Sequence, residues 1–256
     1  MAVAPAERGI STQVSSQDGR RPLINEARAL GEFLNIQFHP IYFGFGVPHG
    51  TGDPVLTIPG FTASDASLFF LNTFLTRIGY DVHRSGIIYH RDPEHEITRL
   101  SQRVKEIHER REQKVHIVGH SLGGVVGRGI CHLSPDEVAS FTALGSPIGD
   151  FEKDVDSFVL AWAKMTIPSF DQPDELRERK EQLSEPLQED IKTTYIYTKG
   201  DGVVDWRSTV DHGFQTTNVE VPGTHFALVA NPHAYKHLAD ALAEATETVM
   251  ECKEIF

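Results

Sequence analysis

A short apolar strand that runs directly into a glycine-flanked serine is the feature that most restricts how this chain can fold. Residues 114–118 lead into Gly119-His120-Ser121-Leu122-Gly123, and a stretch of helical character follows at residues 125–132. The two glycines allow a sharp turn that holds the serine in a strained backbone conformation. Its hydroxyl then stands at a helix N-terminus, where the dipole favours negative charge. Ser121 is the candidate nucleophile; the alternative is a glycine-rich turn with an incidental serine.

Apolar runs alternate with helical patterns on both sides of this turn. Predicted strands occupy residues 55–58, 80–84, 114–118, 138–144, 193–198 and 217–221, and predicted helices occupy residues 23–34, 66–78, 92–111, 125–132 and 232–249. A strand–helix–strand order requires parallel strands, because each helix crosses over between neighbours. Continuous apolar runs are typical of strands that are covered on both faces. The predicted fold class is therefore α/β, with a doubly wound, mostly parallel sheet.

The alternation breaks between residues 151 and 190, where no strand-like run occurs. We interpret this segment as a helical cap insertion over the C-terminal edge of the sheet, where open α/β sheets bind ligands. Trp162 and Met165 belong to its amphipathic part; they either line an acyl pocket or form a packing face of the cap. Residues 1–22 are polar and are interpreted as a flexible leader. We expect residues 23–256 to form one domain.

Composition limits the partners and the compartment. The net charge of −12 argues against a nucleic-acid partner or an anionic membrane surface. The sequence has neither an apolar run long enough to span a bilayer nor the pattern of a signal peptide, so no integral membrane segment is expected. Cys131 and Cys252 lie far apart, which favours free thiols in a reducing cytoplasm. The oligomeric state stays open.

No cofactor and no metal are expected from the sequence. The histidines that cluster in the first half of the chain match no common ligand spacing; they are His83, His90, His95 and His108. Solvated side chains are the simpler interpretation for them.

A serine nucleophile at neutral pH needs a histidine base and a carboxylate that fixes the imidazole tautomer. On a doubly wound sheet these partners come from loops after later strands. His225 is the candidate base, because it lies in a short glycine-containing loop after the last predicted strand. The loop after the preceding strand carries both Asp201 and Asp205, with Asp211 close behind. Asp201 is favoured because it comes first and lies between glycines, and Asp205 is the alternative.

Two backbone N–H groups are the candidate oxyanion hole. The first belongs to Leu122, the residue after the nucleophile. The second belongs to Phe61, in the loop that follows the strand at residues 55–58, where Gly60 permits close approach of the backbone. A plain turn is the alternative interpretation of this second loop.

These motifs, in this order, resemble the bacterial lipase and esterase branch of the α/β-hydrolases. The resemblance covers the chain from about Val55 to the C-terminus and includes Gly-His-Ser-Leu-Gly-Gly at residues 119–124. It implies an α/β-hydrolase fold, a Ser-His-Asp acyl-enzyme mechanism and a variable cap. The oxyanion loop departs from the family because it lacks the His-Gly dipeptide of many lipases. The part before about Gly52 has no clear counterpart.

The expected function is hydrolysis of a small-molecule carboxylic ester with an apolar acyl group. Ser121 would be the nucleophile, His225 the base and Asp201 the acid. An acyltransferase or thioesterase would use the same groups, and the sequence does not distinguish them from an esterase. A catalytically silent binding protein is the alternative from a different class.

Overall fold

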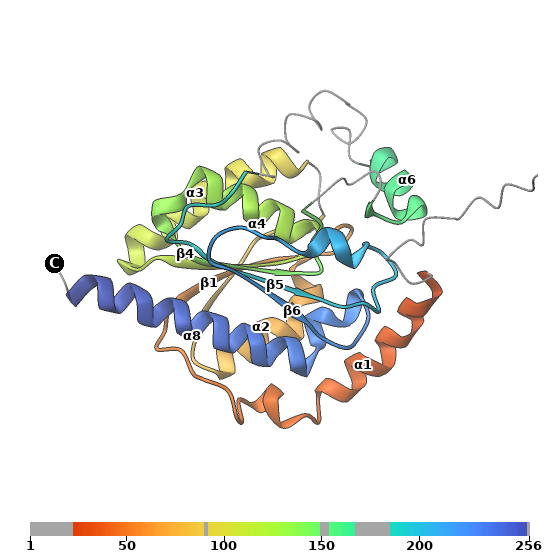
Figure 1. The fold of residues 1–256 in the computed structure, drawn as a ribbon, viewed down its shortest axis with the longest axis horizontal. Coiled ribbons are helices and arrows are strands. Elements are labelled where there is room, and N and C mark those ends of the chain that lie inside the picture. Colours follow the sequence, from red (N-terminus) through yellow and green to blue (C-terminus); the bar gives the residue numbers. More distant parts are fainter. Residues whose placement is uncertain (1–22, 90–91, 149–153, 167–184, 255–256) are drawn as a thin grey trace, which may run out of the picture.

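Six strands form one parallel sheet in the computed structural model, which describes residues 23–89, 92–148, 154–166 and 185–254 (Figure 1). The strands are β1 (Pro54–Ile58), β2 (Asp81–Arg84), β3 (Val115–His120), β4 (Val138–Leu144), β5 (Lys192–Tyr197) and β6 (Thr216–Glu220). Their spatial order is β2-β1-β3-β4-β5-β6, and every neighbouring pair is parallel. The predicted α/β class with a doubly wound parallel sheet is confirmed.

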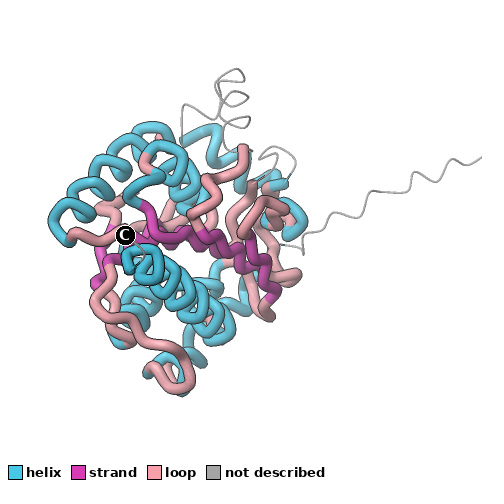
Figure 2. The backbone as a smooth tube through the Cα atoms, turned by 60° about the vertical axis from the view of Figure 1, so that its left-hand side comes forward, coloured by secondary structure: helices cyan, strands magenta, loops and turns pink. Residues whose placement is uncertain are grey.

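Helices cover both faces of the sheet (Figure 2). They are α2 (Phe69–Arg77), α3 (Pro93–Arg111), α4 (Leu122–Leu133) and α8 (Pro232–Glu254). Successive residues of a strand point to opposite faces, so each strand supplies two cores. Val55 and Val118 pack into the core shared with α2 and α8. Leu56 and Ile117, their neighbours in sequence, pack into the core shared with α3 and α4.

The direction of winding reverses between β1 and β3. The chain passes from β1 outward to β2, returns across β1 to β3, and then continues in the other direction through β4, β5 and β6. In open α/β sheets, ligands bind outside the carboxyl ends of the strands at such a switch point. Phe61 follows β1 and Ser121 follows β3, so both lie at this position.

The segment ahead of the sheet consists of η1 (Leu23–Arg28), α1 (Ala29–Ile36) and η2 (Pro40–Phe43). Helix α1 packs against η7 (Phe226–Ala230), the short helix that follows His225 (Figure 1). Three further short helices complete the described elements outside the cap; they are η3 (Asp65–Leu68), η4 (Pro135–Glu137) and η6 (Trp206–Thr209). The segment without a family counterpart therefore touches the part of the fold that carries the candidate base.

Part of the predicted cap insertion lies within the described residues. Helix α6 (Ser157–Thr166) lies to one side of the sheet (Figure 1). Residues 151–153 and 167–184 of the predicted cap insertion and the predicted leader at residues 1–22 lie outside the described residues. Among the residues that the structure describes, no helix has the length and apolar character needed to cross a membrane.

Candidate active site

Ser121 joins β3 to α4 with a strained backbone, at φ 52° and ψ −123°. Such a conformation costs on the order of 1–3 kcal/mol for a residue other than glycine. Two backbone hydrogen bonds hold it: Ser121 N–H donates to Leu144 O, and Gly124 N–H donates to Ser121 O, each at 2.9 Å. The hydroxyl makes no capping bond to α4. The strained serine turn expected from the sequence is present, and α4 begins at Leu122, earlier than the sequence pattern indicates.

The first turn of α4 lies directly against the end of β1. A Cβ atom at Gly123 would be 2.3 Å from Ile58 O and 2.4 Å from Pro59 O, so only glycine fits there. A Cβ atom at Gly60 would be 3.1 Å from the Cβ of Ser121. These close approaches place the loop after β1 beside the serine.

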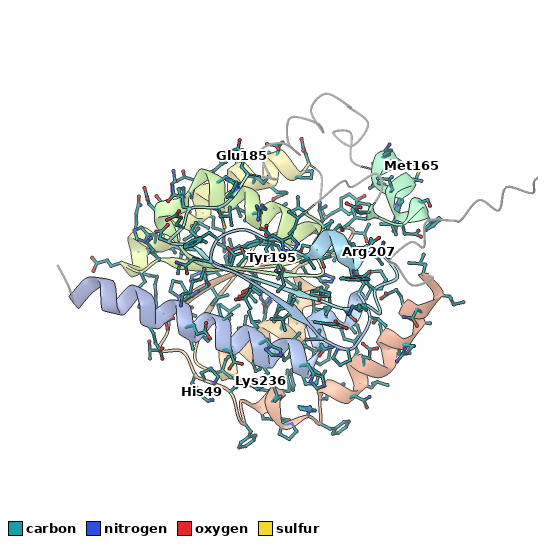
Figure 3. All side chains as sticks on the ribbon, viewed as in Figure 1. His49, Met165, Glu185, Tyr195, Arg207 and Lys236 are labelled. Atoms are coloured by element: carbon teal, nitrogen blue, oxygen red, sulfur yellow. The ribbon has the colours of Figure 1, made fainter. Side chains whose placement is uncertain are left out.

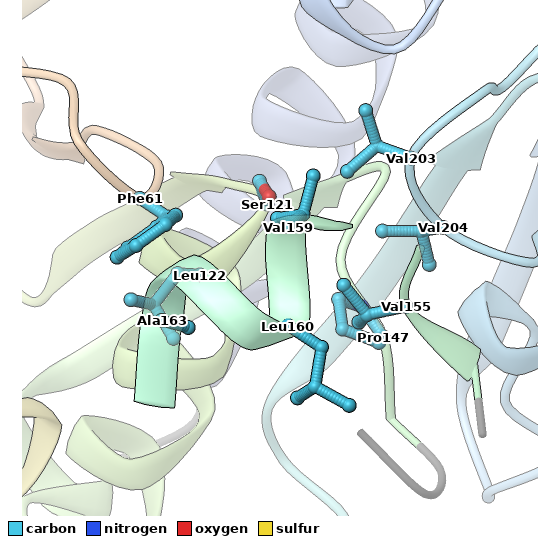
Figure 4. Close-up of a pocket in the computed structure, with 10 residues that line it drawn as sticks. All are labelled: Phe61, Ser121, Leu122, Pro147, Val155, Val159, Leu160, Ala163, Val203 and Val204. Carbon is cyan, nitrogen blue, oxygen red and sulfur yellow. The ribbon is translucent and has the colours of Figure 1, made fainter. Parts of the chain in front are cut away.

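The two predicted oxyanion donors, Phe61 and Leu122, line one pocket together with Ser121 (Figure 4). Leu122 is the first residue of α4, so its N–H has no acceptor within the helix. Phe61 lies in the adjacent loop, one residue after Gly60. The arrangement can supply two backbone donors next to the serine; their role as an oxyanion hole stays a prediction.

His225 and Asp201 form a buried hydrogen-bonded pair. The imidazole Nδ1 lies 2.7 Å from Asp201 Oδ2, and each residue is 1% exposed. The other carboxylate oxygen, Oδ1, accepts hydrogen bonds from the backbone N–H groups of Val203 at 2.8 Å and Val204 at 2.7 Å. Both oxygens are therefore held, and the carboxylate cannot rotate away from the imidazole without breaking these bonds.

Opposing effects determine the pKa of His225. Burial disfavours the charged imidazolium and would lower the pKa. The charge of Asp201 and its hydrogen bond raise it, and the carboxylate of Glu26 raises it further, so the pKa of His225 lies above its ordinary value. An imidazole in this environment is a stronger base than an isolated buried histidine.

The alternative acids have other partners. Asp205 precedes η6, and its Oδ1 accepts the backbone N–H of Arg207 at 3.0 Å, which is the role of a helix N-cap. Asp211 forms an ion pair with the buried side chain of Arg128 at 2.8 Å. Of the three aspartates, the structure brings Asp201 to His225.

His120 connects the serine turn to the histidine loop, a contact that the sequence did not suggest. Its Nε2 lies 3.0 Å from the backbone oxygen of His225, and the two ring centroids are 5.0 Å apart. Burial and the nearby charge of His225, partly offset by this hydrogen bond, lower the pKa of His120 to about 3. The ring is therefore neutral at pH 7, and Nε2–H donates to the carbonyl. Because His120 precedes Ser121, this bond fixes the serine turn relative to His225.

The pocket at Ser121 is apolar (Figure 4). Among the described residues that line it, Ser121 is the one polar side chain. The apolar lining residues are Phe61, Leu122, Pro147, Val155, Val159, Leu160, Ala163, Val203 and Val204. Such a wall can hold an apolar acyl group next to the serine hydroxyl.

Trp162 and Met165, the two predicted pocket or cap residues, lie elsewhere on α6. The Trp162 ring packs edge-on against Phe61 with centroids 5.6 Å apart, so it supports the pocket wall from outside. Met165 is 79% exposed and points away from the main body (Figure 3). Val159 and Ala163 face the pocket instead.

The described part of the cap is joined to the loop that carries Asp201. Val155 and Val204 form an antiparallel bridge. Asp156 N–H donates to Val203 O, and Asp205 N–H donates to Asp154 O, each at 2.7 Å. The loop that carries the candidate acid is therefore also bound to the described part of the cap, just before α6.

Glu26 is a further site residue that the sequence interpretation missed. Its buried carboxylate accepts hydrogen bonds from three backbone N–H groups of the two loops that carry Asp201 and His225.

No cluster of three or more histidine, cysteine or acidic side chains that could hold a metal ion occurs within the described part of the chain.

Comparisons with solved structures place the fold. The chain is similar to the Bacillus licheniformis lipase BlEst2 in mature form, with 17% identity over 72% of this chain and 89% of that chain and a TM-score of 0.55. A structure of the metagenome-derived lipolytic enzymes LipS and LipT is 17% identical over 78% of this chain and 96% of that chain, with a TM-score of 0.61. The thioesterase domain from the Curacin biosynthetic pathway is 13% identical over 75% of this chain and 92% of that chain, with a TM-score of 0.55.

At these identities the likeness establishes the fold and no more. The chain has the α/β-hydrolase fold, as the sequence motifs predicted. No protein-family model matches the sequence, and no curated protein matches it. A fold alone does not determine an activity, which depends on the chemistry of the site.

Proposed function

We propose that this protein is a serine hydrolase that cleaves small-molecule carboxylic esters with an apolar acyl group. The observation that carries the proposal is the buried His225–Asp201 pair, with its 2.7 Å hydrogen bond, tied through His120 to a strained serine that opens into an apolar pocket. The α/β-hydrolase fold and its lipase neighbours support the same reaction class.

In the proposed first step, Ser121 Oγ attacks the ester carbonyl carbon. His225 Nε2 takes the hydroxyl proton as the new C–O bond forms, and the carbonyl electron pair moves onto oxygen. Asp201 holds Nδ1–H, which keeps Nε2 free to accept a proton and stabilises the imidazolium. The N–H groups of Phe61 and Leu122 would stabilise the oxyanion.

The tetrahedral intermediate then collapses. The bond to the leaving alkoxide breaks, and Nε2–H of the His225 imidazolium gives its proton to that oxygen, which leaves an acyl group on Ser121. A water molecule next attacks the acyl carbon while His225 accepts its proton. Collapse of the second intermediate returns the proton to Ser121 Oγ and releases the carboxylic acid.

The pocket composition sets the substrate class. A charged acyl group would lose its hydration against the valine and leucine walls without a polar partner, which costs several kcal/mol. An alkyl chain gains about 0.8 kcal/mol for each CH₂ group buried. We therefore expect preference for uncharged, aliphatic acyl groups. The proposal includes the cytoplasmic location that the sequence separation of Cys131 and Cys252 favours.

Hydrolysis of a series of p-nitrophenyl esters, from acetyl to palmitoyl, tests this function. Wild-type protein should release p-nitrophenol, with kcat/KM rising along the series until the chain fills the pocket. Ser121→Ala should reduce the rate by several orders of magnitude. A folded wild-type protein that hydrolyses none of these esters would contradict the proposal.

Thioester hydrolysis is the second candidate, because the thioesterase domain shares the fold and the same attack on an acyl carbon would serve. Matched oxygen esters and thioesters of one acyl chain distinguish the two reactions. A kcat/KM ratio that favours the thioester would reassign the leaving group and leave the triad unchanged. Formation of a new ester when an acceptor alcohol is added would identify an acyltransferase.

A further inference from the structure

One carboxylate from the segment ahead of the sheet binds both loops of the candidate acid–base pair. Glu26 lies in η1 and is 7% exposed. Its Oε1 accepts Gly202 N–H at 2.8 Å and His225 N–H at 3.1 Å, and its Oε2 accepts Phe226 N–H at 3.0 Å. Gly202 follows Asp201, so one side chain holds the backbone at both members of the pair.

This arrangement determines the distance between the two loops. The loops after β5 and β6 are joined to each other by the His225–Asp201 bond and by Thr198 Oγ1, which donates to Gly223 O at 2.9 Å. Glu26 adds three charge-assisted bonds on the backbone side, and such bonds are stronger than neutral ones. A shift of either loop would break at least one of them.

The same carboxylate contributes charge at the imidazole. The charged and titratable groups that face His225 are Asp201 from the loop after β5, Glu26 from η1 and the neutral ring of His120 from β3. Both carboxylates stabilise the imidazolium that forms when the base accepts a proton. Among the described residues, no cation pairs with Glu26 to cancel this field.

We propose that Glu26 is a positioning residue for the base. Its carboxylate fixes the position of the Asp201 loop relative to the His225 loop and adds negative charge beside the imidazole. The inference rests on the proposed hydrolase function. Glu26 does not touch the substrate, so it acts through His225. A purely structural role would lower stability without changing the pH at which the base titrates.

A matched pair of variants separates these roles. Glu26→Gln keeps one carbonyl oxygen but removes the charge. Glu32→Gln is the control, because Glu32 lies on α1 and accepts Thr224 N–H at 3.2 Å in the same loop. Unlike Glu26, it is not among the groups that raise the pKa of His225. The measurement is kcat and KM for p-nitrophenyl butyrate across pH.

For Glu26→Gln we expect kcat about tenfold lower at the plateau, KM within about twofold, and an acidic limb of kcat/KM that moves to lower pH. The limb moves in that direction because removal of a nearby negative charge lowers the pKa of the histidine. Glu32→Gln should keep both the plateau and the limb of the wild type. Superimposable profiles for the two variants would overturn the proposal.

A second substitution covers the case in which Glu26→Gln does not fold, as judged by circular dichroism. Glu26→Asp keeps the charge but is one methylene shorter, so it cannot reach both loops. It should retain the wild-type acidic limb with a lower kcat, and a kcat equal to that of Glu32→Asp would overturn the proposal. Wild-type protein without ester hydrolysis would contradict the proposed function itself, whereas active wild type with an unchanged Glu26→Gln variant contradicts the positioning role alone.

Discussion

His225 Nδ1 and Asp201 Oδ2 lie 2.7 Å apart although their residues are 24 positions apart in the chain. The parallel register of β5 and β6 brings the two loops to the same edge of the sheet. Because Asp201 Oδ1 is already held by two backbone N–H groups, Oδ2 is left to face the imidazole. This constraint distinguishes Asp201 from the other aspartates nearby.

Exchange of each aspartate for asparagine should separate their roles. Asp201→Asn removes the acceptor that fixes the His225 tautomer, and kcat should fall by about 10⁴. Asp205→Asn should leave kcat within about twofold, because asparagine also caps a helix. The measurement is steady-state ester hydrolysis by both variants. A collapse of activity in Asp205→Asn with near-normal Asp201→Asn would reverse the assignment.

Replacement of Gly60 by alanine should reduce the activity. An added Cβ would lie 3.1 Å from both His120 Nδ1 and Ser121 Cβ, so the serine must shift by a few tenths of an ångström. We expect Gly60→Ala to lower kcat by about tenfold, since a misplaced nucleophile loses its attack geometry.

Gly31→Ala is the matched control for this substitution. Gly31 lies within α1, and nothing lies within 4 Å of the Cβ position. This variant should keep full activity and raise the free energy of unfolding by about 0.5–1 kcal/mol, because alanine is the better helix former. Equal kcat values for the two variants would contradict the importance of close approach at Gly60.

Chain-length preference should respond to the pocket face of α6. Ala163 lines the pocket, whereas Ala161, on the same helix, is exposed. Ala163→Phe fills part of the pocket and should shift the optimum of the p-nitrophenyl ester series to shorter acyl chains. Ala161→Phe should leave the optimum in place. A shift of equal size in both variants would show that the pocket does not hold the acyl group.

Buried neutral histidines should make the fold sensitive to acid. Burial, partly opposed by the charge of Asp53, lowers the pKa of His116 to about 4. Between pH 6.5 and about 4 the unfolded chain binds a proton that the folded chain does not, so stability falls as pH falls through this window. The expected loss is about 1.4 kcal/mol per pH unit for one such histidine. His120 acts in the same direction, with a pKa lowered to about 3.

Urea unfolding at several pH values checks this expectation. His116→Gln should flatten the acid dependence, and His95→Gln, at a side chain that is 67% exposed, should not. His225 adds nothing to this acid dependence well below pH 6.5. Its raised pKa leaves it protonated there in both the folded and the unfolded chain, so its contribution to stability does not change with pH. Unchanged acid dependence in His116→Gln would contradict the neutral buried state.

Local patterns were sufficient to predict the framework. The central strands β1 and β4 are largely apolar runs closed by Pro59 and Gly145. The serine motif lies between a strand pattern and a helix pattern, which is the context that a strand–turn–helix requires. The positions of Asp201 and His225 follow from topology, since loops after consecutive parallel strands meet at one edge. The loop pattern favoured Asp201 but left Asp205 as the alternative, because the contact of Asp201 with His225 depends on how the two loops pack together.

Long-range contacts account for what the sequence could not predict. Glu26 meets Gly202 across 176 positions, and its partners are backbone N–H groups that every residue but proline carries. The amphipathic pattern predicted helix α6 but not which face of the helix points toward the pocket. Val159 and Ala163, rather than the larger Trp162 and Met165, face the pocket.

Covalent labelling of Ser121 tests the proposed mechanism most directly. A fluorophosphonate should add one phosphonyl group to folded wild-type protein, and peptide mass spectrometry should place it on Ser121. Ser121→Ala should take up none, and Ser146→Ala, at a serine that is 2% exposed, should label as the wild type does. Absence of an adduct on folded wild type, or equal labelling of Ser121→Ala, would contradict a nucleophilic role for Ser121.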